Sequence, residues 1–241
     1  MVGAPTGTGA SLLGRLCHGD SLAFDIGEPA RLPSAAVDAR IAVLASGTGT
    51  NLQALLDDPQ VGPCIVLALS DRADAGCLER ARARNVRVVV VEATRRAEFD
   101  RALLEILRSH DVEFVALAGF MRILSREVVG AFRDRILNVH PALLPMFPGA
   151  HAVRDALDWG VKVTGATIHL VDEEVDHGPI VLQEAVPVLP EDDEASLHAR
   201  IREVEHRLFP RAVRLLAEGR LKVEGRRVHF IDGPSAEDGP A

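Results

Sequence analysis

The stretch Ile41-Ala-Val-Leu-Ala-Ser-Gly-Thr-Gly-Thr-Asn-Leu52 joins a continuous apolar run to a glycine-containing loop. Four to five consecutive apolar residues are typical of a strand that is buried on both faces. The leucines that follow, Leu52, Leu55 and Leu56, have the spacing of one helix face. Glycines between a strand and a helix allow the tight turn that such a junction needs. The stretch therefore predicts a strand–loop–helix unit, the first of an α/β sheet.

The same alternation continues downstream. Further strands are predicted at 64–69, 86–91 and 114–117, and helices at 73–84 and around 99–107. Strands that alternate with helices indicate a parallel sheet covered on both faces.

The pattern changes after residue 135. A short strand at 136–140 runs into a proline-rich segment, and two longer strands, 163–171 and 180–188, are predicted to pair antiparallel around a loop that contains Asp176. An apolar stripe from Leu197 to Val213 predicts a long final helix. The predicted fold is thus an α/β, doubly wound, mostly parallel, Rossmann-like sheet with an antiparallel strand pair and a long C-terminal helix.

Three segments follow from this pattern. Residues 1–38 are punctuated by glycines and prolines and are expected to form a flexible N-terminal extension. Residues 39–224 are expected to form one domain, with 39–134 as the half that holds nucleotide or phosphate and 135–224 as the half that carries the chemistry. Residues 225–241 are expected to be a short C-terminal tail.

Composition excludes several classes of protein. The chain has 241 residues, 47% of them hydrophobic and 26% charged, which is ordinary for a globular protein. Its net charge of -8 disfavours nucleic acid as a partner. No apolar run approaches the roughly 20 residues of a membrane span. Three cysteines without a CxxC pair disfavour a disulfide framework or structural zinc, and with no secretory signal we expect a cytoplasmic protein.

The glycine loop is a candidate phosphate site, because backbone amides at a helix N-terminus attract anions. A dinucleotide site is less favoured, since Leu52 stands where that fingerprint requires a third glycine. The plainer interpretation is that Thr50 or Asn51 merely caps the helix.

A polar group lies at the end of the strand at 136–140. Asn138 and His140 are two residues apart and project to the same face, at the carboxyl end where open α/β sheets bind ligands. An amide beside an imidazole suits the stabilisation of an oxyanion. A carboxylate from Asp176 near His140 would favour the charged imidazole and could accept a proton.

Two further histidines have simpler interpretations. His169 is expected to lie in polar packing or in a pocket wall. A metal site made of His140, His169 and His177 fits no zinc spacing, so no metal is expected.

Four motifs together resemble one family. They are Gly47-Thr-Gly-Thr-Asn-Leu-Gln-Ala-Leu55, Leu117-Ala-Gly-Phe-Met-Arg-Ile-Leu124, Asn138-Val-His-Pro-Ala-Leu-Leu-Pro145 and Asp176-His-Gly-Pro-Ile-Val-Leu-Gln183. In this order they resemble the phosphoribosylglycinamide formyltransferases, a folate-dependent family, from about residue 40 to about residue 223.

The resemblance implies an activity. Such an enzyme moves a formyl group from the co-substrate 10-formyltetrahydrofolate to the amine of 5-phosphoribosylglycinamide, by direct attack and without a covalent enzyme intermediate. By this match, Asn138 and His140 stabilise the oxyanion, and Asp176 sustains the imidazolium and relays a proton through water. The C-terminal half becomes the folate and catalytic half.

The resemblance also implies binding residues. The ribonucleotide positions are Gly49, Thr50, Asn51 and Glu205. The folate positions are Arg96, Met121, Arg122, Ile123, Leu124, Asn138, Asp172 and Asp176, with Arg96 near the glutamate tail of the folate. Met146 departs from part of the family, which has lysine there.

Alternatives remain open. A formyltetrahydrofolate deformylase shares the core, but residues 1–39 are too few for its usual N-terminal regulatory domain. Methionyl-tRNA formyltransferases carry an RNA-binding barrel, and sugar-nucleotide formyltransferases differ in the first loop. A non-catalytic nucleotide-binding module would not need the trio. We expect small-molecule partners only, no nucleic acid or membrane, and a monomer or homodimer.

Overall fold

The computed structural model describes residues 38–232. The predicted N-terminal extension lies outside these residues apart from Asp38, and so does the end of the predicted tail, 233–241. The described residues belong to one compact unit.

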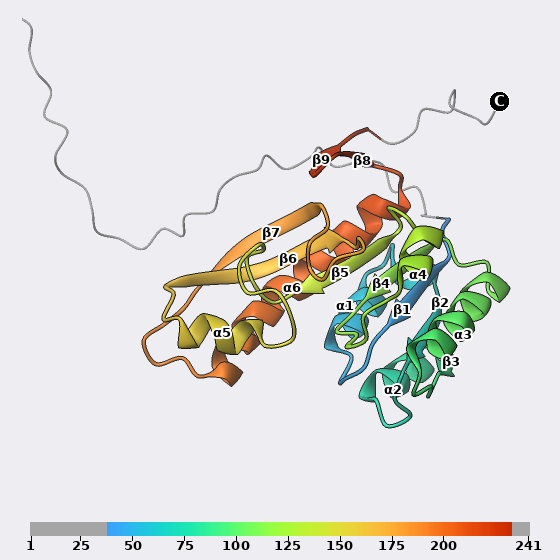
Figure 1. Ribbon diagram of the computed structural model, residues 1–241, viewed down its shortest axis with the longest axis horizontal. Coiled ribbons are helices and arrows are strands. Elements are labelled where there is room, and N and C mark those ends of the chain that lie inside the picture. Colours follow the sequence, from blue (N-terminus) through green and yellow to red (C-terminus); the bar gives the residue numbers. More distant parts are fainter. Residues whose placement is uncertain (1–37, 233–241) are drawn as a thin grey trace, which may run out of the picture. The chain divides into compact units, whose positions relative to one another are not determined.

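Seven strands form one sheet in the order β3-β2-β1-β4-β5-β6-β7 (Figure 1). Their bounds are β1 Ile41–Leu44, β2 Ile65–Ser70, β3 Arg87–Val90, β4 Phe114–Leu117, β5 Ile136–His140, β6 Val163–Leu170 and β7 Ile180–Pro187. Strands β1 to β5 are parallel, whereas β6 pairs antiparallel with both β5 and β7. The predicted fold class is confirmed, including the antiparallel pair.

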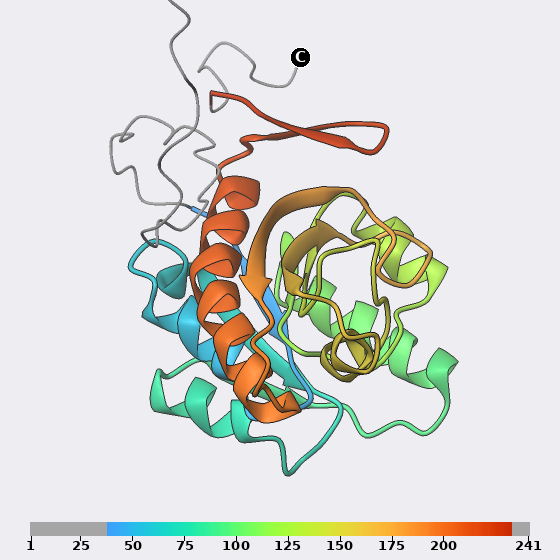
Figure 2. The same ribbon diagram turned by 90° about the vertical axis from the view of Figure 1, so that its left-hand side faces the viewer.

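Helices cover both faces of this sheet. Their bounds are α1 Thr50–Asp57, α2 Gly76–Ala83, α3 Arg96–Ser109, α4 Arg126–Ala131, α5 Ala152–Asp158 and α6 Glu194–Ala217, with a 3-10 turn η1 at Gly62–Cys64. Helices α1, α2 and α6 lie on one face and α3 and α4 on the opposite face (Figure 2). One hydrophobic cluster joins the first group to the sheet, and a second joins α3 and α4 to it. Among the described residues, no helix is both long and apolar enough to cross a membrane.

Two features after residue 150 were not predicted. The short helix α5 ends beside Trp159, whose side chain is 79% exposed. Beyond α6, β8 (Leu221–Glu224) and β9 (Arg227–Phe230) form an antiparallel hairpin across the expected start of the tail. Leu221, Val223 and Val228 of this hairpin pack against the α6-side cluster. The segment from 221 to 230 is therefore part of the folded unit.

Candidate active site

The carboxyl end of β5 opens into a cleft of about 510 Å³. The walls come from the loops after β4, β5 and β6, from the N-terminus of α1 and from α6. Of the predicted residues, Asn51, Met121, Arg122, Ile123, Leu124, Asn138, His140, Asp172, Asp176 and Glu205 line it. The structure thus brings the predicted trio and most of the predicted binding residues to one place.

His140 is held by a backbone carbonyl on one side and faces a carboxylate on the other. Its side chain is buried, and Nε2 lies 2.8 Å from the carbonyl oxygen of Phe147, which places a proton on Nε2. Nδ1 lies 3.4 Å from Oδ2 of Asp176. Burial lowers the pKa of His140, and the opposing effects of Asp176 and the Phe147 carbonyl do not restore it. Asp176 does favour the charged imidazole, in the direction expected, but burial has the larger effect on the pKa of His140.

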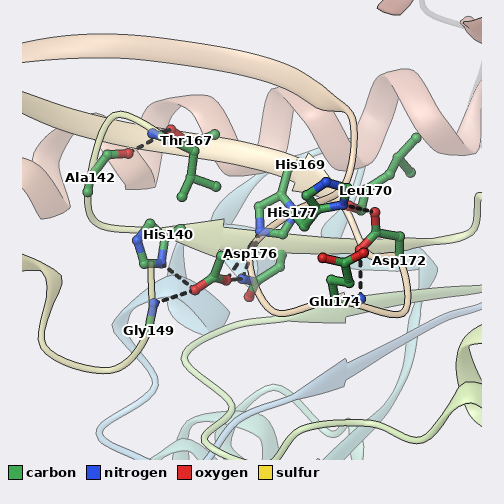
Figure 3. A network of polar contacts seen from close by, with 12 residues as sticks. His140, Ala142, Gly149, Thr167, His169, Leu170, Asp172, Glu174, Asp176 and His177 are labelled. Carbon is green, nitrogen blue, oxygen red and sulfur yellow. Dashed lines mark hydrogen bonds and ion pairs between the residues drawn. The ribbon is translucent and has the colours of Figure 1, made fainter. Parts of the chain in front are cut away.

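Asp176 lies between two imidazoles, as Figure 3 shows. Its Oδ2 accepts a hydrogen bond from the amide of Gly149 at 2.8 Å, and its Oδ1 accepts one from Nδ2 of Asn138 at 3.3 Å. Burial alone would raise the pKa of Asp176. The contacts with His169 and Gly149 and the nearby imidazoles outweigh burial, so the pKa is lowered and the carboxylate is charged.

His169 lies in polar packing and in the wall of the cleft, as expected. It lies opposite Asn138 in the register of β5 and β6, and its ring is buried. Nδ1 contacts the carbonyl oxygen of Leu170 at 2.9 Å, while Nε2 faces Asn138 Nδ2 at 3.1 Å and Asp176 Oδ1 at 3.6 Å. His169 therefore joins two members of the trio. Within residues 38–232 no cluster of three or more histidines, cysteines or acids has the arrangement of a metal site.

The loop that follows His140 is fixed by a buried threonine. Thr167 Oγ1 donates to the carbonyl of Ala142 at 2.6 Å and accepts from the amide of Leu144 at 3.1 Å. Gln183 Nε2 donates to both Thr167 Oγ1 and the Leu144 carbonyl, each at 2.9 Å. The backbone that supplies the Phe147 carbonyl and the Gly149 amide is thereby tied to β6 and β7.

A second polar pair lies in the same cleft where α1 meets α6. Asn51 Nδ2 donates to Glu205 Oε2 at 2.9 Å, and both side chains are buried. Burial raises the pKa of Glu205, and the hydrogen bond from Asn51 opposes this only in part. Oδ1 of Asn51 is buried and has no hydrogen-bond partner among the described residues. An acceptor of this kind at a cleft wall suits a donor group on a ligand.

The glycine loop turns tightly against α2. Gly49 precedes α1 with φ 75°, and a Cβ there would lie 2.5 Å from Cβ of Cys77. No side chain caps α1, so the interpretation of Thr50 or Asn51 as a simple cap is wrong. Thr50 lines an adjacent groove of about 660 Å³, together with Arg80 and His206, rather than the cleft itself.

The segment 121–124 lines the cleft with contrasting side chains. Met121 and Ile123 are 66% and 59% exposed, whereas Leu124 is buried. Arg122 donates to the carbonyl of Ala93 at 2.9 Å, and its guanidinium lies 4.3 Å from the ring centroid of Phe99. Exposed apolar side chains beside a polar cluster suit a flat organic ligand.

Arg96 lies outside the cleft lining. Its guanidinium donates to the carbonyl of Leu124 and lies 3.7 Å from the carboxylate of Asp100. In this arrangement Arg96 supports the backbone of the 121–124 segment from α3.

The fold and the site together define a class: an α/β protein with an oxyanion-type polar cluster at the carboxyl ends of its strands. The formyl transferase family model matches residues 39–213. The chain belongs to this family, which confirms the resemblance seen in its motifs.

Individual relatives show which members of the family this chain resembles. The phosphoribosylglycinamide formyltransferase of Mycobacterium tuberculosis is 47% identical over 204 residues, which cover 83% of this chain and 94% of that protein. The crystal structure of glycinamide ribonucleotide transformylase 1 from Symbiobacterium toebii is 48% identical with a TM-score of 0.79, covering 86% of this chain and 100% of that one.

A longer relative matches over only part of its length. The trifunctional purine biosynthetic protein adenosine-3 of Drosophila pseudoobscura is 47% identical over 207 residues, or 83% of this chain. The match spans 15% of that protein, and 20% of its namesake from Bos taurus. The similarity therefore concerns one segment of these multifunctional proteins.

Proposed function

We propose that this chain transfers the formyl group of 10-formyltetrahydrofolate to the amine of 5-phosphoribosylglycinamide, a step of purine biosynthesis. The observation that carries the proposal is the convergence of Asn138, His140 and Asp176 in one cleft with the Asn51–Glu205 pair. Membership of the formyl transferase family, and relatives of matching length that carry this activity in their names, support it.

The two halves would bind different substrates. The amides at the N-terminus of α1 suit the phosphate of the ribonucleotide, because α1 lacks a side-chain cap. Glu205 and the unpartnered Oδ1 of Asn51 suit hydroxyl or amine donors of the same substrate. Met121, Ile123 and Asp172 suit the folate. This assigns nucleotide binding to residues 39–134 with help from α6, the chemistry to 135–224, and folate binding to 135–224 together with the 121–124 segment.

The chemistry follows from the charges at rest. The amine attacks the formyl carbon and forms a C–N bond, and the carbonyl oxygen becomes an oxyanion. Asn138 Nδ2 stabilises that charge as a hydrogen-bond donor, and the imidazole of His140 stabilises it once a second proton is on Nδ1. The amine then loses a proton to the His140–Asp176 pair, directly or through water. The oxyanion then returns to a carbonyl as the bond between the formyl carbon and N10 breaks. N10 takes up the proton held by the His140–Asp176 pair, which leaves tetrahydrofolate and formylglycinamide ribonucleotide.

The test is the release of tetrahydrofolate from 10-formyltetrahydrofolate with and without the ribonucleotide. Release that requires the ribonucleotide, with one formylated product per folate, is the expected result. Release without the ribonucleotide would mean that water is the acceptor and would support the deformylase instead. Absence of release under both conditions would contradict both enzymes.

A further inference from the structure

The residue that precedes His177 in the β6–β7 loop has an unusual backbone. Asp176 adopts φ 50°, a left-handed conformation that is uncommon except in glycine, asparagine and aspartate. Its carboxylate must nevertheless face both His140 and His169. A backbone of this kind persists only where neighbouring contacts determine it.

Both ends of the loop are firmly attached. Leu170 donates to the carbonyl of Pro179, and Val171 donates to the carbonyl of Ile136, each at 2.9 Å. A Cβ on Gly178 would lie 1.8 Å from the carbonyl oxygen of Leu170, so the backbone at Gly178 packs directly against the end of β6. Between these ends, the loop from Asp172 to His177 is mostly exposed.

His177 connects this loop to the C-terminal hairpin. Nδ1 of its ring lies 2.7 Å from Oδ2 of Asp172 across the loop (Figure 3). Arg226 approaches from the other side, with Nη1 3.0 Å from Nε2 of the ring and Nη2 donating to the His177 carbonyl at 2.6 Å. Donors and acceptors match if the neutral ring carries its proton on Nδ1. Arg226 thus contacts both the backbone and the side chain of the residue after Asp176.

The turn and the base of the hairpin determine where Arg226 lies. Arg226 lies in the two-residue turn between β8 and β9, after Gly225 with φ 61°, the position where such turns favour glycine. The base of the hairpin is closed by Arg220, whose backbone carbonyl accepts from the amide of Ile231 at 3.0 Å and whose Nε donates to the Ile231 carbonyl at 3.2 Å.

We propose that Arg226 is a positioning residue for the formyl transfer, which holds the Asp176 carboxylate in place through His177 and makes the C-terminal hairpin part of the active site. The inference rests on the proposed function. It assigns a role to a segment that the sequence analysis took to be a tail.

Kinetics of Arg226→Ala test the role. The kcat is expected to fall about fivefold, the effect of losing one exposed charge-assisted contact, while the KM for each substrate stays within about twofold. Arg226→Lys should restore less than half of the loss, because an ammonium cannot contact the ring and the carbonyl together. Arg227→Ala is the matched control, exposed on the same hairpin and without a hydrogen bond or ion pair to the loop. Equal kcat values for Arg226→Ala and Arg227→Ala would overturn the proposal.

Measuring the effect of Arg226→Ala in the Asp176→Asn variant separates positioning from general destabilisation. If Arg226 acts through Asp176, Arg226→Ala should cause no further loss of kcat in the Asp176→Asn chain. A full fivefold loss there would mean that Arg226 acts independently of Asp176, against the proposal.

Hydrogen exchange tests the contact without any assay of activity. Peptides that span 171–179 should exchange faster in unliganded Arg226→Ala than in Arg227→Ala or the wild type, with no change elsewhere in the sheet. Unchanged exchange would overturn the proposal. A wild-type chain that transfers no formyl group would refute the proposed function, whereas the exchange would still show whether Arg226 holds the loop.

Discussion

The N-terminal part of the sheet, β1 to β4, and the C-terminal part, from β5 onward, contribute to the cleft in different ways. Around α1, the N-terminal part presents backbone amides at a helix end that no side chain caps, placed by the close approach of Gly49 to Cys77. After β5, the C-terminal part presents side chains, and burial or contact with neighbours shifts the pKa of both His140 and Asp176. Holding an anion requires only well-placed amides, whereas moving a proton requires groups whose charge the surroundings control.

The strongest way to separate these roles is Asp176→Asn. Asparagine has the same shape and tolerates a positive φ, so the chain should fold. Loss of the charge opposite His140 should lower kcat by about 1000-fold, within the range for acid–base and electrostatic groups. The Kd of the ribonucleotide, measured by calorimetry, should stay within about twofold. Comparable losses of affinity and kcat would contradict a purely catalytic role.

The backbone site can be disrupted with one methyl group. In Gly49→Ala the new Cβ meets Cys77 at 2.5 Å on a backbone with φ 75°, which should lower the free energy of unfolding by about 2–4 kcal/mol. Ribonucleotide affinity should fall with it. Gly47→Ala is the control, because a Cβ there has no atom within 4 Å, and its effect should stay below about 1 kcal/mol. Urea unfolding followed by far-ultraviolet circular dichroism compares the two, and equal stabilities would refute this account of the loop.

The smallest expected effect concerns Glu205, where the two parts meet. Burial raises the pKa of Glu205 above the ordinary 4.5 that it has in the unfolded chain. At pH values between 4.5 and the raised pKa, the folded chain therefore binds more protons than the unfolded chain. Stability should therefore fall as pH rises through that window. Glu205→Gln keeps the acceptor for Asn51 and removes this titration, so it should be more stable than the wild type by about 1 kcal/mol at pH 8.

Thermal unfolding of both chains from pH 4 to pH 8 measures the difference. Ribonucleotide affinity should fall in the variant despite its greater stability, since a charged acceptor is lost. A variant that is less stable than the wild type at pH 8 would mean that the buried charge is stabilised by more than Asn51.

Sequence patterns predicted the features that depend on neighbouring residues. The strand at 136–140 and the shared direction of Asn138 and His140 follow from local apolarity and the two-residue period of a strand. The role of His169 depends on the antiparallel register of β5 and β6, which sets it opposite Asn138. Its place one residue before the end of β6 was the available signal.

The other differences between the sequence predictions and the structure arise from burial and from the shortness of some helices. The pKa of His140 is governed by burial, which exceeds the effect of the nearby carboxylate and which a sequence pattern does not quantify. Helices α4 and α5 have six and seven residues, too few for a clear apolar period. In the hairpin, Leu221, Val223 and Val228 do alternate around Gly225, but basic residues obscured this pattern.

The exposed side chain of Trp159 has an optical consequence. It is the single tryptophan of a chain that has no tyrosine, and it is 79% exposed in the folded state. Tryptophans are usually well buried, and their emission shifts to longer wavelength when unfolding exposes them to water. Here the indole is already hydrated, so its emission should change little on unfolding. It should instead shift to shorter wavelength when another molecule covers the end of α5, so this intrinsic fluorophore reports on association rather than on folding.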